Sequence, residues 1–149
     1  MSFAPDVIVT TDYSPATIAL VGEAKASADN LDEGAHQLKQ YMLRMNCPVG
    51  IILTPTVLRI YKDRFVGRTQ DSIELVGDFP SAELFEAWQP VANTASAIES
   101  ALVGWLDNLA HTGQVGVGDP RLQSVIGEHI LPAISGGRVS IVRPRVWES

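Results

Sequence analysis

A short apolar stretch in the first half constrains the fold of this chain more than any other feature. Residues 49–53 read VGIIL, follow Pro48, and are separated by the turn-forming residues 54–56 from a second β-rich stretch, residues 57–61. Five residues without a polar side chain are typical of a strand buried on both faces. Such a strand needs cover on each side, so we expect an α/β fold in which helices flank both sides of a mixed central sheet.

Two further strands are expected before it. Residues 6–11 (DVIVTT) and 17–25 (TIALVGEAK) are β-rich. The residues between them, 12–16, are typical of a turn. The two strands should therefore form a hairpin.

A helix should follow the hairpin. Asn30 or Asp32 can cap its first turn, and apolar residues recur at helical spacing as far as Met45. Pro48 lies just beyond, where a proline cannot continue a helix. We expect this helix to end near Met45.

The second half of the chain is predicted to be more helical. A short helix is expected over residues 81–88, and an amphipathic one over residues 94–111. A third should cover residues 121–131, where Pro132 stops it, and residues 139–142 form a final strand. The chain contains no internal repeat or low-complexity linker, so residues 1–149 are expected to be one domain.

The negative charge of the chain is concentrated in one segment. The net charge is −6, and residues 72–112 hold six acidic side chains and no Lys or Arg. We expect this acidic, helical segment to face away from any nucleic acid, since backbone binding depends on Lys and Arg.

The chain shows no sign of export or membrane insertion. It lacks a run of about 18 apolar residues, and its first residues lack the basic and apolar regions of a secretory signal. Cys47 is the only cysteine, which excludes an internal disulfide and a cysteine-built zinc site. A cytoplasmic location is therefore expected.

Two carboxylates and an ammonium group fall at the ends of the hairpin strands. Glu23 and Lys25 are two residues apart, so on a strand they project from one face, together with Ala19 and Val21. Asp6 lies at the start of the neighbouring strand. Charged groups brought together at a sheet edge are costly unless an ion joins them.

These groups suit magnesium and phosphodiester chemistry. Mg²⁺ prefers one or two carboxylates together with waters and phosphate oxygens, and the backbone carbonyl of Ala24 could add a ligand. A metal held there by Asp6 and Glu23 would neutralise phosphate charge, and Lys25 would orient the attacking water or stabilise the developing negative charge. Each residue also has an ordinary interpretation, as a turn residue or a solvated pair at a strand end.

The pattern Pro5-Asp6 followed by Glu23-Ala24-Lys25 resembles the motif of the PD-(D/E)XK restriction-endonuclease-like superfamily. Both halves lie on expected strands, as that motif requires. The E-x-K part alone occurs by chance in most chains.

The next helix extends the resemblance. Gln37 and Tyr41 match the Q-x-x-x-Y motif of several nuclease branches, and residues four apart share one helical face. With the strand-turn-strand that follows, the motif order looks most similar to the N-terminal nuclease domain of type I restriction enzyme R subunits. The resemblance covers about residues 5–62.

The resemblance implies a metal-dependent deoxyribonuclease that uses Mg²⁺, with Mn²⁺ as a substitute. Asp6 and Glu23 would be the metal ligands, and Lys25 would be catalytic. Gln37 and Tyr41 would help to position DNA near the site.

The beginning of the chain departs from the family pattern. The family core normally starts with a helix, which often contributes an acidic residue, and a strand, whereas five residues precede Asp6 here. A helix over residues 122–131, with Glu128 as an additional metal ligand, and a strand over 138–142 could replace them. The fold would then be permuted, or this segment (120–145) would be exchanged between two subunits. A homodimer is also expected, because the missing elements leave an edge to cover.

Two other functions remain open. The chain could be a catalytically inactive module of the same fold that binds DNA or a partner protein. It could also be an unrelated α/β protein that assembles through the apolar helix 94–109 and has no nucleic-acid role. A basic cluster at and after the fourth strand could contact a phosphate backbone or form a solvated sheet edge; it comprises Arg59, Lys62, Arg64 and Arg68.

Overall fold

The computed structural model describes residues 5–11 and 17–142, and six strands form a single mixed sheet in the order β5-β4-β3-β2-β1-β6. The strands are β1 (Val7–Thr11), β2 (Thr17–Ala24), β3 (Val49–Leu53), β4 (Val57–Asp63), β5 (Ile73–Pro80) and β6 (Arg138–Ile141). β2 and β3 are parallel, and every other neighbouring pair is antiparallel. The expected hairpin of β1 and β2 is confirmed; its turn, residues 12–16, lies outside the described residues.

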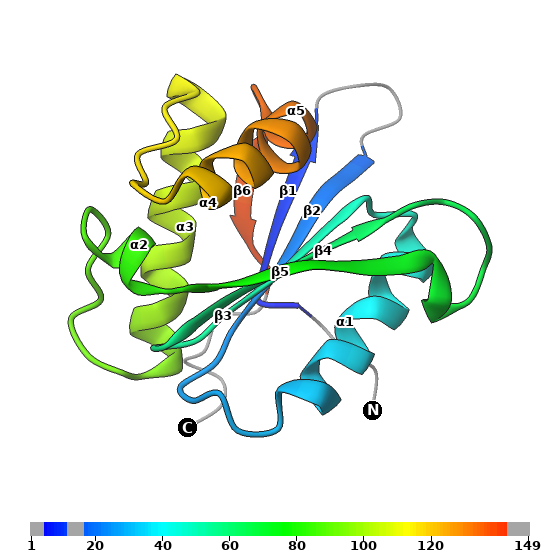
Figure 1. Cartoon of the computed structure of the whole chain (residues 1–149), viewed down its shortest axis with the longest axis horizontal. Helices are drawn as coiled ribbons and strands as arrows, with labels where there is room; N and C mark the ends of the chain where they lie inside the picture. Colours follow the sequence, from blue (N-terminus) through cyan, green and yellow to red (C-terminus); the bar gives the residue numbers. More distant parts are fainter. Residues whose placement is uncertain (1–4, 12–16, 143–149) are drawn as a thin grey trace.

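Helices cover both faces of this sheet, which confirms the expected α/β layering (Figure 1). One face carries α1 (Leu31–Met45), the crossover between the parallel strands β2 and β3. The other carries α3 (Ala95–Thr112) and a C-terminal helical segment. The remaining short elements are η1 (Gln70–Ser72), α2 (Ala82–Phe85), α4 (Pro120–Val125), the π-helical η2 (Ile126–Ile130) and α5 (Leu131–Ile134).

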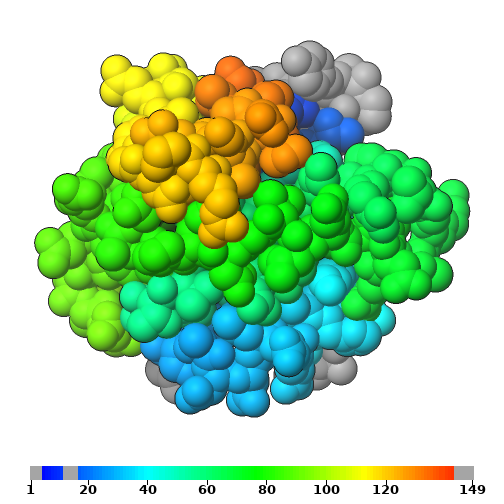
Figure 2. All heavy atoms as spheres, in the orientation of Figure 1, coloured from blue at the N-terminus to red at the C-terminus, as the bar shows by residue number. Residues whose placement is uncertain are grey.

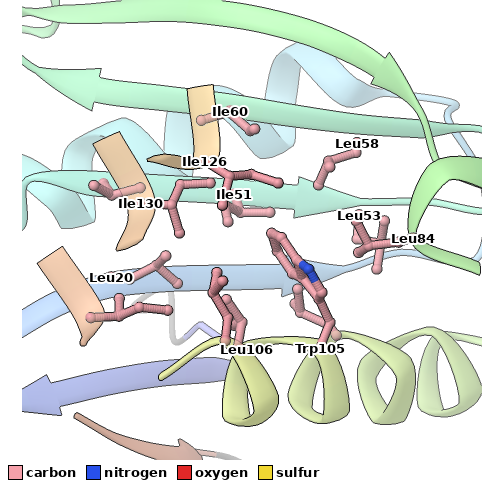
Figure 3. Close-up of a cluster of buried hydrophobic side chains, with 14 of the residues drawn as sticks. Leu20, Ile51, Leu53, Leu58, Ile60, Leu84, Trp105, Leu106, Ile126 and Ile130 are labelled. Carbon is pink, nitrogen blue, oxygen red and sulfur yellow. The ribbon is translucent and has the colours of Figure 1, made fainter. Parts of the chain in front are cut away.

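The larger of two hydrophobic clusters lies between the sheet and α3 (Figure 3). Trp105 and Leu106 of α3 and Ile126 and Ile130 of η2 pack there against strand side chains. The apolar stripe of α3 is therefore buried within its own chain. The alternative in which the helix at residues 94–109 mediates assembly loses its basis, because that face is already covered.

The smaller cluster lies between the sheet and α1, and it includes Val21, Leu38, Met42 and Ile52. This helix begins and ends close to the predicted positions. Asn30 occupies the cap position in a left-handed conformation, but its side chain makes no capping hydrogen bond. The cap was therefore predicted at the right residue for the wrong reason.

A β-bulge in β2 changes which side chains share a face. Thr10 pairs with Ile18 and Val9 pairs with Leu20, so Ala19 is an extra residue in the ladder. Ala19 consequently packs with Leu20 in the larger cluster, whereas Val21 packs on the α1 side. The prediction that Ala19 shares the face of Glu23 was wrong, because it assumed uninterrupted alternation.

Strand β5 was not predicted, and the expectation of a wholly helical acidic segment over residues 72–112 was wrong. β5 is an edge strand, and its residues cross the middle of the surface seen in Figure 2. Its alternation is weak because several of its side chains are exposed or half-buried, including Leu75. Its acidic side chains Glu74 and Asp78 lie opposite Lys62 and Arg59 of β4.

The C-terminal helix runs past Pro132, where we expected it to stop. The chain passes through the π-helical turn η2 and then forms α5, in which Pro132 occupies the first turn. A proline is tolerated there because the missing N–H would have no intrahelical partner.

The last strand completes the sheet beside β1. β6 pairs antiparallel with β1, with Val7 opposite Ile141 and Thr10 opposite Arg138. The edge that led us to expect a homodimer or a segment exchange is thus covered within one chain. No helix among residues 5–11 and 17–142 combines the length and apolar character needed to cross a membrane.

Candidate active site

A pocket lies where β2 ends and α1 begins, and four of the predicted site residues line it: Asp6, Glu23, Lys25 and Gln37. Ala24, whose backbone carbonyl we expected as a ligand, lines the same pocket. The connection from β2 to α1 and the first turns of α1 complete the wall, together with the first residue of α3. These residues are Ala26, Ser27, Asp29, Asn30, Glu33, Gly34 and Ala95.

The three charged residues of the motif belong to the α1 face of the sheet. Val21 and Ile8 both pack beneath α1, and strand alternation places Glu23 two residues after Val21 and Asp6 two residues before Ile8 on that same face. Lys25 continues the series. The bulge lies earlier in β2, so it leaves this part of the alternation intact.

Backbone hydrogen bonds join Asp6 and Glu23 across the two strands. The Asp6 N–H donates to Glu23 Oε1 at 3.0 Å and to the Gly22 carbonyl at 3.2 Å. In return, the Ala24 N–H donates to Asp6 Oδ2 at 2.9 Å. Each carboxylate thus has one oxygen fixed by the neighbouring strand, which holds the two groups side by side.

Both carboxylates are removed from solvent. Asp6 is 1% exposed and Glu23 is 7% exposed. Burial, reinforced by the charge of Asp6, raises the pKa of Glu23 from 4.5 to about 8, and the Lys25 ammonium opposes that rise. At neutral pH the pair therefore retains a proton that a cation between the carboxylates would displace.

Lys25 lies between the sheet and α1. Its backbone N–H donates to the Leu53 carbonyl at 2.9 Å, which fixes the chain after the end of β2. Its side chain crosses Gly34 of α1, because a Cβ built on Gly34 would lie 2.6 Å from Lys25 Cε and 3.2 Å from Nζ. A glycine at this point of the helix leaves room for the lysine side chain.

Tyr41 is not among the described residues that line the pocket. It lies one turn beyond Gln37 on α1 and packs against the smaller hydrophobic cluster. The Arg44 guanidinium lies 5.3 Å from the centre of the Tyr41 ring, and burial raises the pKa of the Tyr41 hydroxyl. The structure thus places Gln37 at the pocket and Tyr41 beside the core.

Glu128 is not brought to the pocket. Its side chain is 72% exposed and lies 3.9 Å from His129 Nε2. The helical segment that carries it leads into Arg138, which pairs with Thr10 near the end of β1, whereas Asp6 precedes the start of that strand (Figure 1). The expectation that Glu128 adds a metal ligand was therefore wrong.

Glu33 and Asp29 are acidic pocket residues that were not predicted from the sequence. Glu33 could have been found, because it precedes Gln37 by four residues and so shares its helical face. Asp29 lies in the connection before α1, where no periodic pattern signals a position.

The basic cluster is largely compensated by the protein itself. Arg59 Nε and Nη2 donate to both carboxylate oxygens of Asp78 at 2.7 and 2.8 Å, and Lys62 Nζ lies 3.6 Å from Glu74. Arg64 donates to the backbone carbonyl of Asp71 at 2.6 Å. The cluster is not a solvated sheet edge, since β5 covers β4.

Among residues 5–11 and 17–142, no group of three or more His, Cys, Asp or Glu side chains is arranged to hold a metal unaided. Comparisons with models of protein families, with curated proteins and with solved structures give no match.

Proposed function

We propose that this protein is a metal-dependent nuclease that hydrolyses the phosphodiester bonds of DNA. The observation that carries the proposal is the meeting of Asp6, Glu23 and Lys25 in one pocket, on one face of two paired strands. Gln37 reaches the same pocket from α1. Asp6, the pair Glu23 and Lys25, and Gln37 come from three separate segments of the chain, so their convergence is a property of the fold.

The donor chemistry of the pocket fits Mg²⁺. Two adjacent carboxylates are costly in a buried site, and burial, followed by the charge of Asp6, raises the pKa of Glu23. A hard divalent cation would offset the repulsion, and Mg²⁺ is commonly held by one or two carboxylates together with waters and substrate oxygens. Because waters and substrate oxygens complete the coordination of Mg²⁺, such a site does not need three acidic side chains from the protein. Asp6, Glu23 and the Ala24 carbonyl would hold the ion.

Bound magnesium would supply charge neutralisation at the scissile phosphate and a lower pKa for the attacking water. The protein's own residues would do the remaining work. Lys25 places a positive charge beside the carboxylates, where it can stabilise negative charge that develops on the phosphate. Gln37 offers an amide that can donate to a phosphate oxygen or to the water. Their backbones are fixed by β2 and α1, so little reorganisation is required.

We further propose that the fold is a permuted restriction-endonuclease-like fold. Its support is β6, which lies beside the strand that follows Asp6, in the position where the resemblance expects the strand before the motif aspartate. The proposed permutation is supported by strand β6 alone, because Glu128 does not reach the pocket as a metal ligand.

The test is cleavage of plasmid and of single-stranded DNA in Mg²⁺ and, separately, in Mn²⁺. We expect cleavage by the wild type that EDTA abolishes and that Lys25→Ala reduces by at least about 100-fold. Lys39→Ala is a matched control. Lys39 lies on the same helix as Gln37, but it is not among the described residues that line the pocket, and its ammonium lies 5.0 Å from the centre of the Tyr61 ring. Equal inactivity of the wild type and Lys25→Ala in both metals would leave the inactive binding module as the better account.

A further inference from the structure

A second pocket lies at the opposite end of α1 from the candidate active site. Its wall combines the last turns of α1 with the loop between β4 and η1. The lining residues that matter here are Gln40, Arg44, Asp63, Phe65 and Arg68. We call it the loop pocket.

Phe65 presents an aromatic ring to solvent at this pocket. It is 59% exposed, and its backbone adopts φ 56°, a left-handed conformation that is uncommon for a bulky residue. The Phe65 N–H donates to Asp63 Oδ1 at 2.8 Å, and the Val66 N–H donates to Ser72 Oγ at 3.1 Å. Hydrogen bonds therefore hold the backbone around an outward-facing ring, a conformation that carries a cost.

The loop is also fastened to α1. Gln70 Nε2 lies 3.0 Å from His36 Nδ1 and donates to the His36 carbonyl at 3.3 Å. Asp63 is the only acid among the described residues that line this pocket. It accepts hydrogen bonds from Ser72 Oγ and from the Phe65 N–H, so its carboxylate is engaged within the loop. These hydrogen bonds hold the loop that carries Phe65 against α1.

Two arginines line the loop pocket together with this exposed ring. Arg44 and Arg68 are both exposed, and neither forms an ion pair with any residue in the described part of the chain. In this they differ from Arg59 and Lys62, which β5 neutralises. In a chain of net charge −6, the loop pocket therefore combines an aromatic surface with two guanidinium groups that no ion pair neutralises in the described residues, although that of Arg44 also lies over the Tyr41 ring.

We infer that the loop pocket binds a single-stranded segment of nucleic acid, with a base stacked on Phe65 and neighbouring phosphates contacting Arg44 and Arg68. The inference rests on the proposed nuclease function and names the form of its substrate. Every base has a face that can stack on an aromatic ring, and guanidinium groups bind phosphate through paired N–H donors. In a duplex the bases already stack on each other, so a base must be unpaired to lie on Phe65.

The two pockets are placed to hold one strand. Gln37 lines the candidate active site and Arg44 lines the loop pocket. The two residues are seven positions apart in α1, so they share a face at a distance of about 10 Å along the axis. An unpaired strand that runs along this face therefore needs only a few nucleotides to reach from one pocket to the other.

The experiment is fluorescence anisotropy of a labelled oligothymidylate of about 16 nucleotides, measured with the full chain in EDTA so that no cleavage occurs. We expect Phe65→Ala to weaken binding by about tenfold and Phe65→Trp, which keeps a ring, to retain it. Arg68→Ala should reduce the salt dependence, the slope of log K against log salt, by about 0.7. As controls, Val66→Ala shortens an apolar neighbour that is even more exposed than Phe65, and Arg138→Ala removes an exposed charge on β6, at the opposite sheet edge from β5.

Binding by Phe65→Ala equal to that of Val66→Ala, or a salt slope of Arg68→Ala equal to that of Arg138→Ala, would overturn the inference. Equal losses on single-stranded and duplex DNA would also overturn it. Because binding is measured without metal, a negative binding result does not affect the cleavage test of the proposed nuclease. A negative cleavage result likewise leaves the binding measurement interpretable.

Discussion

The side chain of Lys25 occupies the space that a side chain at Gly34 would fill, since a Cβ at Gly34 would lie 2.6 Å from Lys25 Cε. The absence of a side chain on the second turn of α1 thus helps to determine where the lysine ammonium lies. In the proposed nuclease, Gly34 is a positioning residue for the group that stabilises charge.

Gly34→Ala should separate stability from activity. Alanine in a helix interior is favoured over glycine by up to about 1 kcal/mol, and the flexible end of Lys25 can move aside. We therefore expect unchanged or higher stability together with a loss of cleavage rate of up to about 100-fold, because the ammonium is displaced. Thermal unfolding and the maximal cleavage rate, measured together, check this.

Gly127→Ala is the matched control, because Gly127 is an exposed helical glycine and a Cβ there meets nothing within 4 Å. It should gain stability and keep full activity. Full activity in Gly34→Ala as well would show that the space over this glycine has no bearing on Lys25.

Glu23 should make the stability of the metal-free protein fall as the pH rises. Because its pKa is raised from 4.5 to about 8 by burial and by Asp6, the native state keeps a proton in this range that the unfolded chain has lost. The free energy of unfolding should therefore decline between about pH 4.5 and pH 8. Glu23→Gln, which stays neutral, should be more stable than the wild type at pH 8, by an amount on the order of a few kcal/mol.

Urea unfolding in EDTA at pH 4.5 and pH 8 measures that difference. The advantage of Glu23→Gln should shrink at the lower pH, where the wild-type side chain is protonated as well. Glu33→Gln removes an exposed carboxylate from the same pocket and controls for the change in net charge. A pH-independent difference between wild type and Glu23→Gln would contradict the assigned environment of Glu23.

Cys47 should be chemically silent in the folded protein. It is fully buried after α1, and burial raises the pKa of its thiol to about 12. Since the thiolate is the reactive form, a disulfide reagent at pH 8 should label the unfolded chain far faster than the native one. Rapid labelling under native conditions would show that the segment between α1 and β3 opens easily.

Much of the architecture could be predicted from the sequence because its signals are local. The apolar run at residues 49–53 and the periodicity of α1 and α3 each reflect burial of one segment against the sheet. β5 was missed because an edge strand with several exposed side chains has weak alternation. The bulge at Ala19 was missed because the pairing of two strands, rather than the sequence of one, determines it.

The candidate site was predictable in part for the same reason. Alternation along β2 placed Glu23 and Lys25 on one face, and Asp6 and Gln37 were added through the resemblance to the nuclease motifs. The role assigned to Glu128 failed because it required knowing at which end of the sheet a distant helix packs. Compensation of the basic cluster was equally hidden, since it depends on the register between β4 and β5.

Metal binding by the paired carboxylates can be measured directly by titrating the protein with Mn²⁺ at pH 8 and following free Mn²⁺ by electron paramagnetic resonance. Asp6 and Glu23 should together hold the ion, so the wild type should bind it while Asp6→Asn and Glu23→Gln bind at least about tenfold more weakly. Glu128→Gln, with an exposed side chain outside the pocket, should bind as the wild type does. Equal Mn²⁺ affinity in the wild type and in Glu23→Gln would contradict the account.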